Sequence, residues 1–195
     1  MKKKSFVMVL ALVLVFAVAV GGVVAWLTDK TDPVKNTFTV GDINIELKET
    51  GAVNGEKTYQ VIPGDTQKKD PTVTVKAGSE DCWLFVKVDE TNNTMTVGEE
   101  TQKIVNYAKA DGWEQGDGTN IPTNVYYRSV TGLTADGARD AVFPVLLNNQ
   151  VTINGNVLKG QITAENQPTL TFTAYAVQKD NIADAATAWS KIPTP

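Results

Sequence analysis

Short runs of alternating apolar residues are the feature that most constrains the fold of this chain. From Phe38 onward, apolar side chains recur mainly at every second position, and the runs are separated by glycine, proline, asparagine and aspartate. A period of two places successive side chains on opposite faces of a β-strand, whereas a helix needs a period of 3.6. Helical spacing is scarce. The sequence therefore predicts an all-β domain built from many short strands.

The runs locate the individual strands. Residues Cys82–Val88 are apolar on both faces, which is typical of a central strand, whereas Leu170–Val177 alternates and predicts a half-buried strand. In the first run the apolar parity changes at Gly41-Asp42, which predicts a bulge or bend. Further strands are expected within five segments: Phe38–Leu47, Tyr59–Val61, Val73–Val75, Val125–Val130 and Ala141–Ile153.

Turn residues and two exceptions to the alternation complete the predicted architecture. The strongest turn signals are Pro63-Gly64-Asp65, Asn54-Gly55 and Asn154-Gly155. The last predicts a tight hairpin between Val151–Ile153 and Val157–Leu158. Short peripheral helices are expected at Glu99–Ala108 and Ile182–Ile192. Seven or more strands in one domain of this size predict a jelly-roll β-sandwich, with residues 38–195 as the domain.

The first 25 residues have the organisation of an export signal. Lys2–Lys4 supply a positive start, and Ser5–Thr28 contains no charged residue. A cleaved signal has an apolar stretch of about 7–15 residues and a membrane span needs about 20, so length alone leaves both open. The small residue Ala25, with Val23 two positions earlier, predicts cleavage between Ala25 and Trp26. The alternative is an uncleaved anchor that tethers the domain to the membrane.

Composition excludes several classes of function. The chain has no histidine, so histidine-based catalytic triads and zinc-binding motifs cannot be built. Its one cysteine, Cys82, cannot form an intramolecular disulfide, and its apolar parity predicts a buried, unreactive thiol. The formal charge is −4, and removal of residues 1–25 takes away three lysines and no acids, leaving −7. An acidic protein does not favour nucleic-acid binding. We expect no cofactor and no enzymatic activity.

One acidic loop and two tryptophans are the remaining candidates for a binding site. Asp111, Glu114 and Asp117 offer oxygen ligands that suit calcium, but their spacing is not that of an EF-hand, so a solvated loop is expected. Trp113 and Trp189 are expected to be core or cap residues rather than ligand-stacking aromatics.

Four blocks, in order along the chain, resemble the TasA and camelysin family, which are secreted proteins of Gram-positive bacteria processed by the SipW type of signal peptidase. The first block is GGVVAWLTD at Gly21–Asp29 followed by NTFTVGDINIEL at Asn36–Leu47. Leu27 stands where the family usually has an aromatic residue. The second is VIPGDTQKKDPTVTVKAGSEDCWLFVKV at Val61–Val88. The third is Gly112-Trp113 with VYYRSV at Val125–Val130, and the fourth is AYAVQKDNIADAATAW at Ala174–Trp189.

The resemblance implies a jelly-roll protein that is exported, cleaved and assembled outside the cell into fibres of a biofilm matrix. In fibre-forming members the new N-terminal segment of one subunit completes the sheet of its neighbour as a donor strand. Here that assembly segment is expected at residues 26–37, with the donor strand reaching to about Val40. The residues expected to take part are Trp26, Leu27, Thr28, Asp29, Pro33, Val34, Phe38 and Val40.

The expected partners are further copies of the chain or related matrix proteins, and the signal peptidase during export. Membrane contact is expected only through the signal segment before cleavage. Three alternatives remain open at this stage. The segment after Ala25 folds back onto its own domain or stays disordered; the protein is a camelysin-like secreted metalloendopeptidase; or it is a membrane-tethered surface adhesion module.

Overall fold

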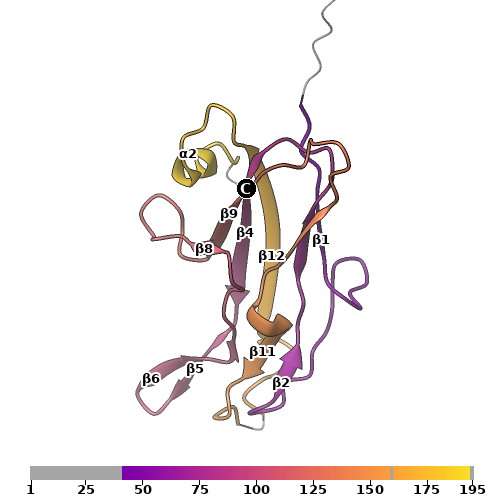
Figure 1. Cartoon of the computed structure of the whole chain (residues 1–195). Coiled ribbons are helices and arrows are strands. Elements are labelled where there is room, and N and C mark those ends of the chain that lie inside the picture. The colour runs from indigo at the N-terminus through magenta and orange to yellow at the C-terminus, as the bar shows by residue number, and fades with distance from the viewer. Residues whose placement is uncertain (1–40, 159, 194–195) are drawn as a thin grey trace, which may run out of the picture. The chain divides into compact units, whose positions relative to one another are not determined.

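The computed structural model describes residues 41–158 and 160–193, and these form an all-β domain with a single short α-helix among them, as predicted (Figure 1). Every strand pair is antiparallel. The strands are β1 (Ile45–Lys48), β2 (Thr66–Lys68), β3 (Thr72–Val75), β4 (Cys82–Thr91), β5 (Thr94–Val97), β6 (Glu100–Lys103), β7 (Val105–Asn106), β8 (Glu114–Gln115), β9 (Val125–Val130), β10 (Ala141–Pro144), β11 (Gln150–Ile153) and β12 (Thr169–Gln178).

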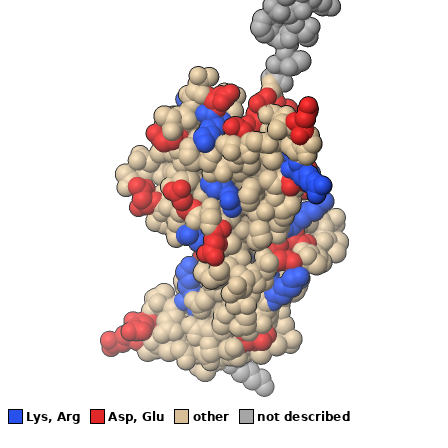
Figure 2. Space-filling view, in the orientation of Figure 1, with Lys and Arg blue, Asp and Glu red and all other residues tan. Residues whose placement is uncertain are grey.

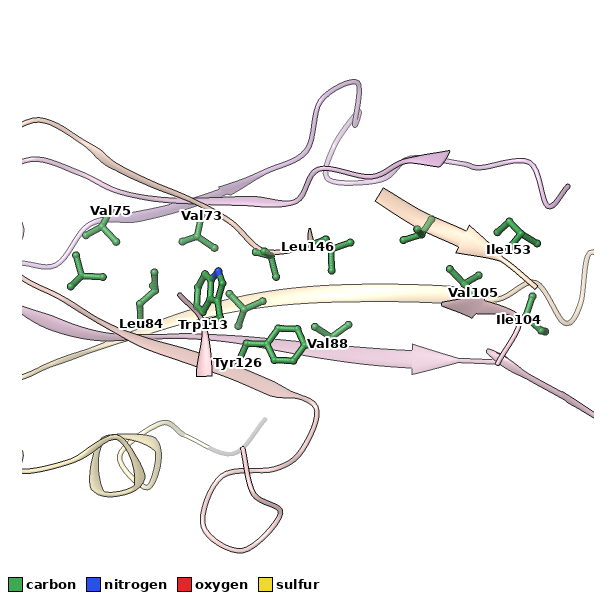
Figure 3. Packing of buried hydrophobic residues seen from close by; sticks show 14 of the residues in the cluster. Val73, Val75, Leu84, Val88, Ile104, Val105, Trp113, Tyr126, Leu146 and Ile153 are labelled. Atoms are coloured by element: carbon green, nitrogen blue, oxygen red, sulfur yellow. The ribbon is translucent and has the colours of Figure 1, made fainter. Parts of the chain in front are cut away.

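The strands lie in two facing layers. One layer is the four-stranded sheet β12-β4-β9-β8, and the other contains the three-stranded sheets β1-β3-β10 and β2-β11-β7. Apolar side chains from both layers meet between them, with Val73 and Val75 on one side and Leu84 and Val88 on the other (Figure 3). The hairpin β5–β6 follows the far end of β4, and its two strands pair with no other described strand.

Strand β4 is central, as its double-sided apolar pattern predicts. Leu84, Val86 and Val88 point into the main core between the layers, whereas Phe85 points to the outer face of the sheet. All four side chains are at most 1% exposed. Phe85 belongs to a second, smaller core between the sheet and the C-terminal helix. The strand is therefore fixed by packing on both sides.

The C-terminal segment covers this second core. Helix α2 (Ala185–Trp189) begins after Asp184, whose carboxylate accepts the backbone N–H of Thr187 at 2.7 Å. Its Trp189 ring packs 5.3 Å from Phe85 and 6.0 Å from Tyr175, measured between centroids. The predicted helix within Ile182–Ile192 is confirmed, and Trp189 is a cap residue as expected. No helix in residues 41–158 or 160–193 is long and apolar enough to cross a membrane.

Trp113 lies in the main core, as predicted. Its side chain is 2% exposed, and its indole N–H donates to the carbonyl of Pro144 at 2.8 Å. The bond satisfies the one polar group that the ring carries into the core. Because Pro144 belongs to β10 and Trp113 immediately precedes β8, this bond ties one layer to the other.

The helix predicted at Glu99–Ala108 is wrong. Strands β6 and β7 occupy this stretch, and Gly98 closes a two-residue hairpin between β5 and β6 with φ of +64°. A positive φ at the first turn position suits glycine and the right-handed twist of paired strands. Strand β6 consists of polar and mostly exposed residues, so the sequence shows no apolar alternation there.

Two other local predictions are also wrong. Residues 59–61 form no strand, because Tyr59 turns its ring toward Lys57 and Lys69 and the backbone of these residues joins no ladder. After β11, Asn154 and Gly155 do form a turn, but the chain then runs on without a second strand. The Asn154 amide instead binds Gln102 and the carbonyl of Lys103, so this turn packs on β6. By contrast, Asn54-Gly55 does close a tight turn, with Val53 and Glu56 bridged.

Cys82 is fully buried, as predicted, and burial raises the pKa of its thiol to about 11, with the Asp81 charge adding to the shift. Its ordinary pKa is near 9. Between these values only the unfolded chain loses the proton, so the free energy of unfolding should fall by about 2–3 kcal/mol as pH rises from 9 to 11. Urea titrations across this range measure the effect.

The matched control for this prediction is Cys82→Ala, which removes the thiol and leaves every tyrosine in place. Its loss of stability between pH 9 and 11 should be smaller than that of the original chain by the contribution of Cys82. An identical decline in both proteins would contradict the prediction. We also expect Cys82→Ser to leave export and assembly intact, since the thiol lies inside the core.

Candidate assembly site

Strand β12 is the long edge strand of the four-stranded sheet. It pairs with β4 along its whole length, from Thr169 opposite Thr91 to Gln178 opposite Cys82, with no interruption in the register. Within the described residues no strand pairs with its other side. A row of backbone donors and acceptors is therefore left without strand partners along ten residues.

The register shows which backbone groups face outward. Beyond the last pair of the ladder, the N–H of Lys179 donates to the carbonyl of Asp81 at 2.8 Å, so these two residues form a hydrogen-bonded pair. In an antiparallel ladder such pairs alternate with pairs that exchange no bonds. The residues that point their N–H and C=O away from β4 are therefore Leu170, Phe172, Ala174 and Ala176.

The same four residues direct their side chains toward the main core, where they are only half-buried. No side chain of β12 is fully buried. The edge thus combines free backbone groups with apolar side chains that a neighbouring strand would cover. This is the combination that strand addition uses, with backbone bonds for affinity and alternate side chains for fit.

Strand β1 is an edge of the facing layer on the same side of the molecule (Figure 1). Cα atoms of β1 and β12 come within 8 Å of each other, but no ladder joins the two strands in the part of the chain described. The N–H of Lys76 donates to the carbonyl of Asn44 at 2.9 Å, so by the same alternation Ile45 and Leu47 turn their backbone groups outward. Their side chains also pack half-buried against the main core.

Three other edge strands carry protecting features that β12 lacks. Strand β8, at the opposite edge of the same sheet, has two residues, β10 contains Pro144, and β1 carries Lys48. Short length, proline and lysine are the usual devices that prevent strand addition at an edge. Strand β12 has none of them in its sequence TLTFTAYAVQ. It is also longer than each of these other edge strands.

A buried lysine closes the gap between the layers near the middle of β12. The Lys69 side chain is 9% exposed, and its Nζ lies 2.9 Å from the Glu49 carboxylate and 5.2 Å from the ring centroid of Phe172. The Tyr59 ring covers the same ammonium at 4.9 Å, and its hydroxyl donates to Glu49. Burial and the neighbouring Glu49 charge raise the pKa of Tyr59. The Lys69 ammonium is thus paired with Glu49 and enclosed by aromatic rings, and its attraction to the Phe172 ring holds that side chain in place on β12.

Charged groups lie mainly beside this edge rather than on it. In Figure 2, basic side chains, interspersed with acidic ones, lie along the side of the view that carries β1 and β2, and the lysines of these strands and of β3's end contribute ion pairs. Several of them are already paired with acids, including Lys48 with Glu46, Lys68 with Asp70 and Lys76 with Asp140. Strand β12 itself contains no charged residue. An incoming segment therefore meets no net charge along the strand.

The acidic loop residues are solvated and do not converge. Asp111, Glu114 and Asp117 are exposed. Glu114 accepts the Tyr127 hydroxyl at 3.0 Å, and Asp117 accepts the backbone N–H of Thr119 at 2.8 Å, a bond that lowers the pKa of Asp117. Among the described residues no group of three or more acidic or cysteine side chains is placed to hold a metal ion.

The residues predicted for cleavage and assembly lie outside the described part of the chain. These are Ala25, Trp26, Leu27, Thr28, Asp29, Pro33, Val34, Phe38 and Val40. The surface that would receive them, β12, was missed as a site by reasoning from sequence. The signal that could have indicated it is the absence of lysine and proline from a strand of alternating pattern. Searches against family models, curated proteins and solved structures found no match to this chain.

Proposed function

We propose that this chain is an extracellular structural protein that assembles into fibres, with the segment after the export signal of one copy added as a strand to β12 of the next. The observation that carries the proposal is the ten-residue edge of β12, which no other described strand covers and which has regular register, half-buried apolar side chains and no protecting residue. The function is non-enzymatic, and the partner is a second copy of the same chain or a related matrix protein.

The donor segment is long enough for the edge. Ten residues of antiparallel strand span about 34 Å, and the segment from Trp26 to Val40 contains 15 residues. Its charged side chains are Asp29, Lys30, Asp32 and Lys35, so the side chains carry no net charge to repel either copy. Phe38 and Val40 share one parity and supply side chains for one face of the added strand.

The incoming strand pairs with β12 alone rather than with β12 and β1 together. Neighbouring strands lie about 4.8 Å apart, so a strand bonded to both edges would hold them about 9.6 Å apart. Cα atoms of β1 and β12 are already within 8 Å of each other. The added strand therefore extends the four-stranded sheet, and its apolar side chains cover Ile45 and Leu47 from the side.

The family resemblance in the sequence agrees with this proposal in fold class, export and assembly. We assign the two layers of antiparallel strands to the jelly-roll class on that basis. In this scheme residues 1–25 serve only for export, and the assembled protein is located in the extracellular matrix or on the cell surface. Negative-stain microscopy of the purified, processed chain tests the function directly. A protein that stays monomeric at every concentration and salt condition tested would contradict it.

Processing at the predicted site creates the new N-terminus on which assembly depends. We expect N-terminal sequencing of secreted material to begin at Trp26, since Ala25 supplies the small residue at the cleaved bond. Ala25→Asp should block cleavage and retain the chain at the membrane. The conservative Ala25→Ser should be processed normally. Secreted protein that begins at Met1 or Lys2 would contradict the prediction.

A further inference from the structure

Arg128 occupies a position where the strand pattern calls for an apolar residue. On β9 it has the same parity as Tyr126 and Val130, which are both buried in the main core, and it lies opposite Leu84 of β4. Its side chain therefore points between the two layers. A charged group at such a position needs partners that compensate for the water it loses.

Two aromatic rings hold the guanidinium. The Cζ atom of Arg128 lies 4.1 Å from the ring centroid of Phe143 and 5.5 Å from that of Trp113. Trp113 and Phe143 meet edge to face at 6.4 Å, and the bond from Trp113 to the carbonyl of Pro144 fixes this corner. Cation–π attraction stabilises the charge and fixes the plane of the guanidinium.

No anion completes the site within the described residues. No carboxylate there forms an ion pair with Arg128, and none of its nitrogens makes a hydrogen bond. Its Nε is covered and has no partner. Gly112 lies beside the two terminal nitrogens, and a Cβ there would crowd them, at 3.3 Å from one and 3.4 Å from the other. Burial also lowers the pKa of Arg128.

We propose that Arg128 binds a carboxylate of a second copy, supplied by Glu99 or Glu100 at the tip of the β5–β6 hairpin. A guanidinium presents a planar fork that matches a carboxylate with two parallel hydrogen bonds. Both glutamates are exposed, and the hairpin that carries them pairs with no other strand in the described part of the chain. The tip appears as an acidic projection at the lower left of the molecule (Figure 2).

The contact must join two copies, because the two groups lie far apart in one. Arg128 sits opposite Leu84 near the start of β4, whereas the hairpin follows Thr91 at the other end of that strand. Seven residues of strand separate these points by roughly 24 Å. A contact between different surfaces at opposite ends is heterologous and propagates in one direction, as a fibre requires. The inference rests on the proposed function and adds a second contact between successive copies.

The first test separates an interface residue from a structural one. Arg128→Met keeps an unbranched apolar stem against the two rings and removes a half-buried charge that has no anionic partner among the described residues, so the thermal midpoint of unfolding should stay equal or rise. Self-association of the processed chain, measured by sedimentation velocity, should weaken by about ten-fold. Arg139→Met is the matched control, because Arg139 is exposed, and it should change neither quantity.

Charge exchange identifies the partner. Arg128→Glu alone and the double variant E99K/E100K alone should each assemble poorly. An equimolar mixture of the two should regain assembly, because every contact in an alternating fibre again joins opposite charges.

Each other outcome overturns the inference. One is an Arg128→Met variant that is destabilised but associates as the original chain does. Another is a mixture of the two charge-exchange variants that does not regain assembly. A third is an Arg128→Met variant that assembles normally but no longer binds an acidic polysaccharide. If the original chain itself never assembles, the proposed function fails as well. If the original chain assembles but the Arg128 variants behave otherwise than expected, only the inference about Arg128 fails.

Discussion

Removal of Trp26–Lys35 should abolish fibre formation and leave a folded, soluble monomer. The described strands begin at Ile45, and the described members of the two cores begin at Ile43, so the deletion leaves all of these side chains in place. Assembly loses its added strand and with it every backbone bond to β12. We expect sedimentation velocity to show one monomeric species and negative-stain microscopy to show no fibres, with the far-UV circular dichroism of the domain unchanged.

A peptide control distinguishes a specific donor from a general loss of chain length. A synthetic peptide of residues 26–40 should bind the truncated protein and should inhibit fibre growth of the original chain by occupying β12. A peptide of the same composition in scrambled order should bind less well, because alternate side chains set the fit. Fibres formed by the truncated protein under conditions where the processed chain forms them would disprove the donor role.

The sequence predicts strands well where one face or both faces are buried. The double-sided run at β4 and the alternating run at β12 are correctly placed, because the core selects apolar residues at a fixed period of two. It fails at the β5–β6 hairpin, where only Met95 is buried, Val97 and Gln102 are half-buried, and the other residues face solvent. A two-stranded hairpin with one buried side chain carries too little apolar alternation to be recognised.

Contacts distant in sequence explain the other failures. Tyr59 reads as part of a strand, but Lys69 and Glu49 hold its ring and hydroxyl in a side-chain cluster instead. Asn154 reads as a hairpin turn, but Gln102 and Lys103 bind its amide. No local pattern contains these partners, since they lie at least ten residues away.

The candidate sites depend on strand order, which the sequence does not state. Alternation identifies β12 as a half-buried strand, but only the order β12-β4-β9-β8 makes it an edge. Likewise, the sequence alone shows that Arg128 stands at a position of β9 where the alternation calls for an apolar residue. Its contacts with the rings of Trp113 and Phe143 become visible only when the two layers are placed face to face. The sequence therefore indicates the strand and the arginine, and the fold shows that the described residues leave the outer side of β12 and the charge of Arg128 without a strand or an anion as partner.

The alternation of backbone groups along β12 allows a sharp test of the proposed edge. Proline lacks the N–H group, so its effect depends on which side the replaced N–H serves. The N–H of Thr173 points toward β4, and that of the adjacent Ala174 points away from it, as the bond between Lys179 and Asp81 requires. Two neighbouring positions thus predict opposite results.

Thr173→Pro should destabilise the domain by about 3 kcal/mol or more, because it removes a ladder bond in the longest strand pair and the ring clashes with β4. That is a large part of the roughly 5–15 kcal/mol that holds a domain folded. Ala174→Pro should change the free energy of unfolding by no more than about 1 kcal/mol, since edge strands tolerate proline where no bond is made. Urea titrations of the two variants measure this difference.

For fibre formation, the more damaging of the two substitutions should be Ala174→Pro, although Thr173→Pro is the more destabilising. Under conditions where both variants are folded, Ala174→Pro should block fibre growth, because it removes a donor in the middle of the recipient edge and its ring obstructs the incoming strand. Ala174→Val keeps the N–H and fills the same half-buried position, so it should still assemble. If Ala174→Pro forms fibres as readily as Ala174→Val, β12 is not the recipient edge. If it destabilises the domain as much as Thr173→Pro does, the outward direction assigned to its N–H is wrong.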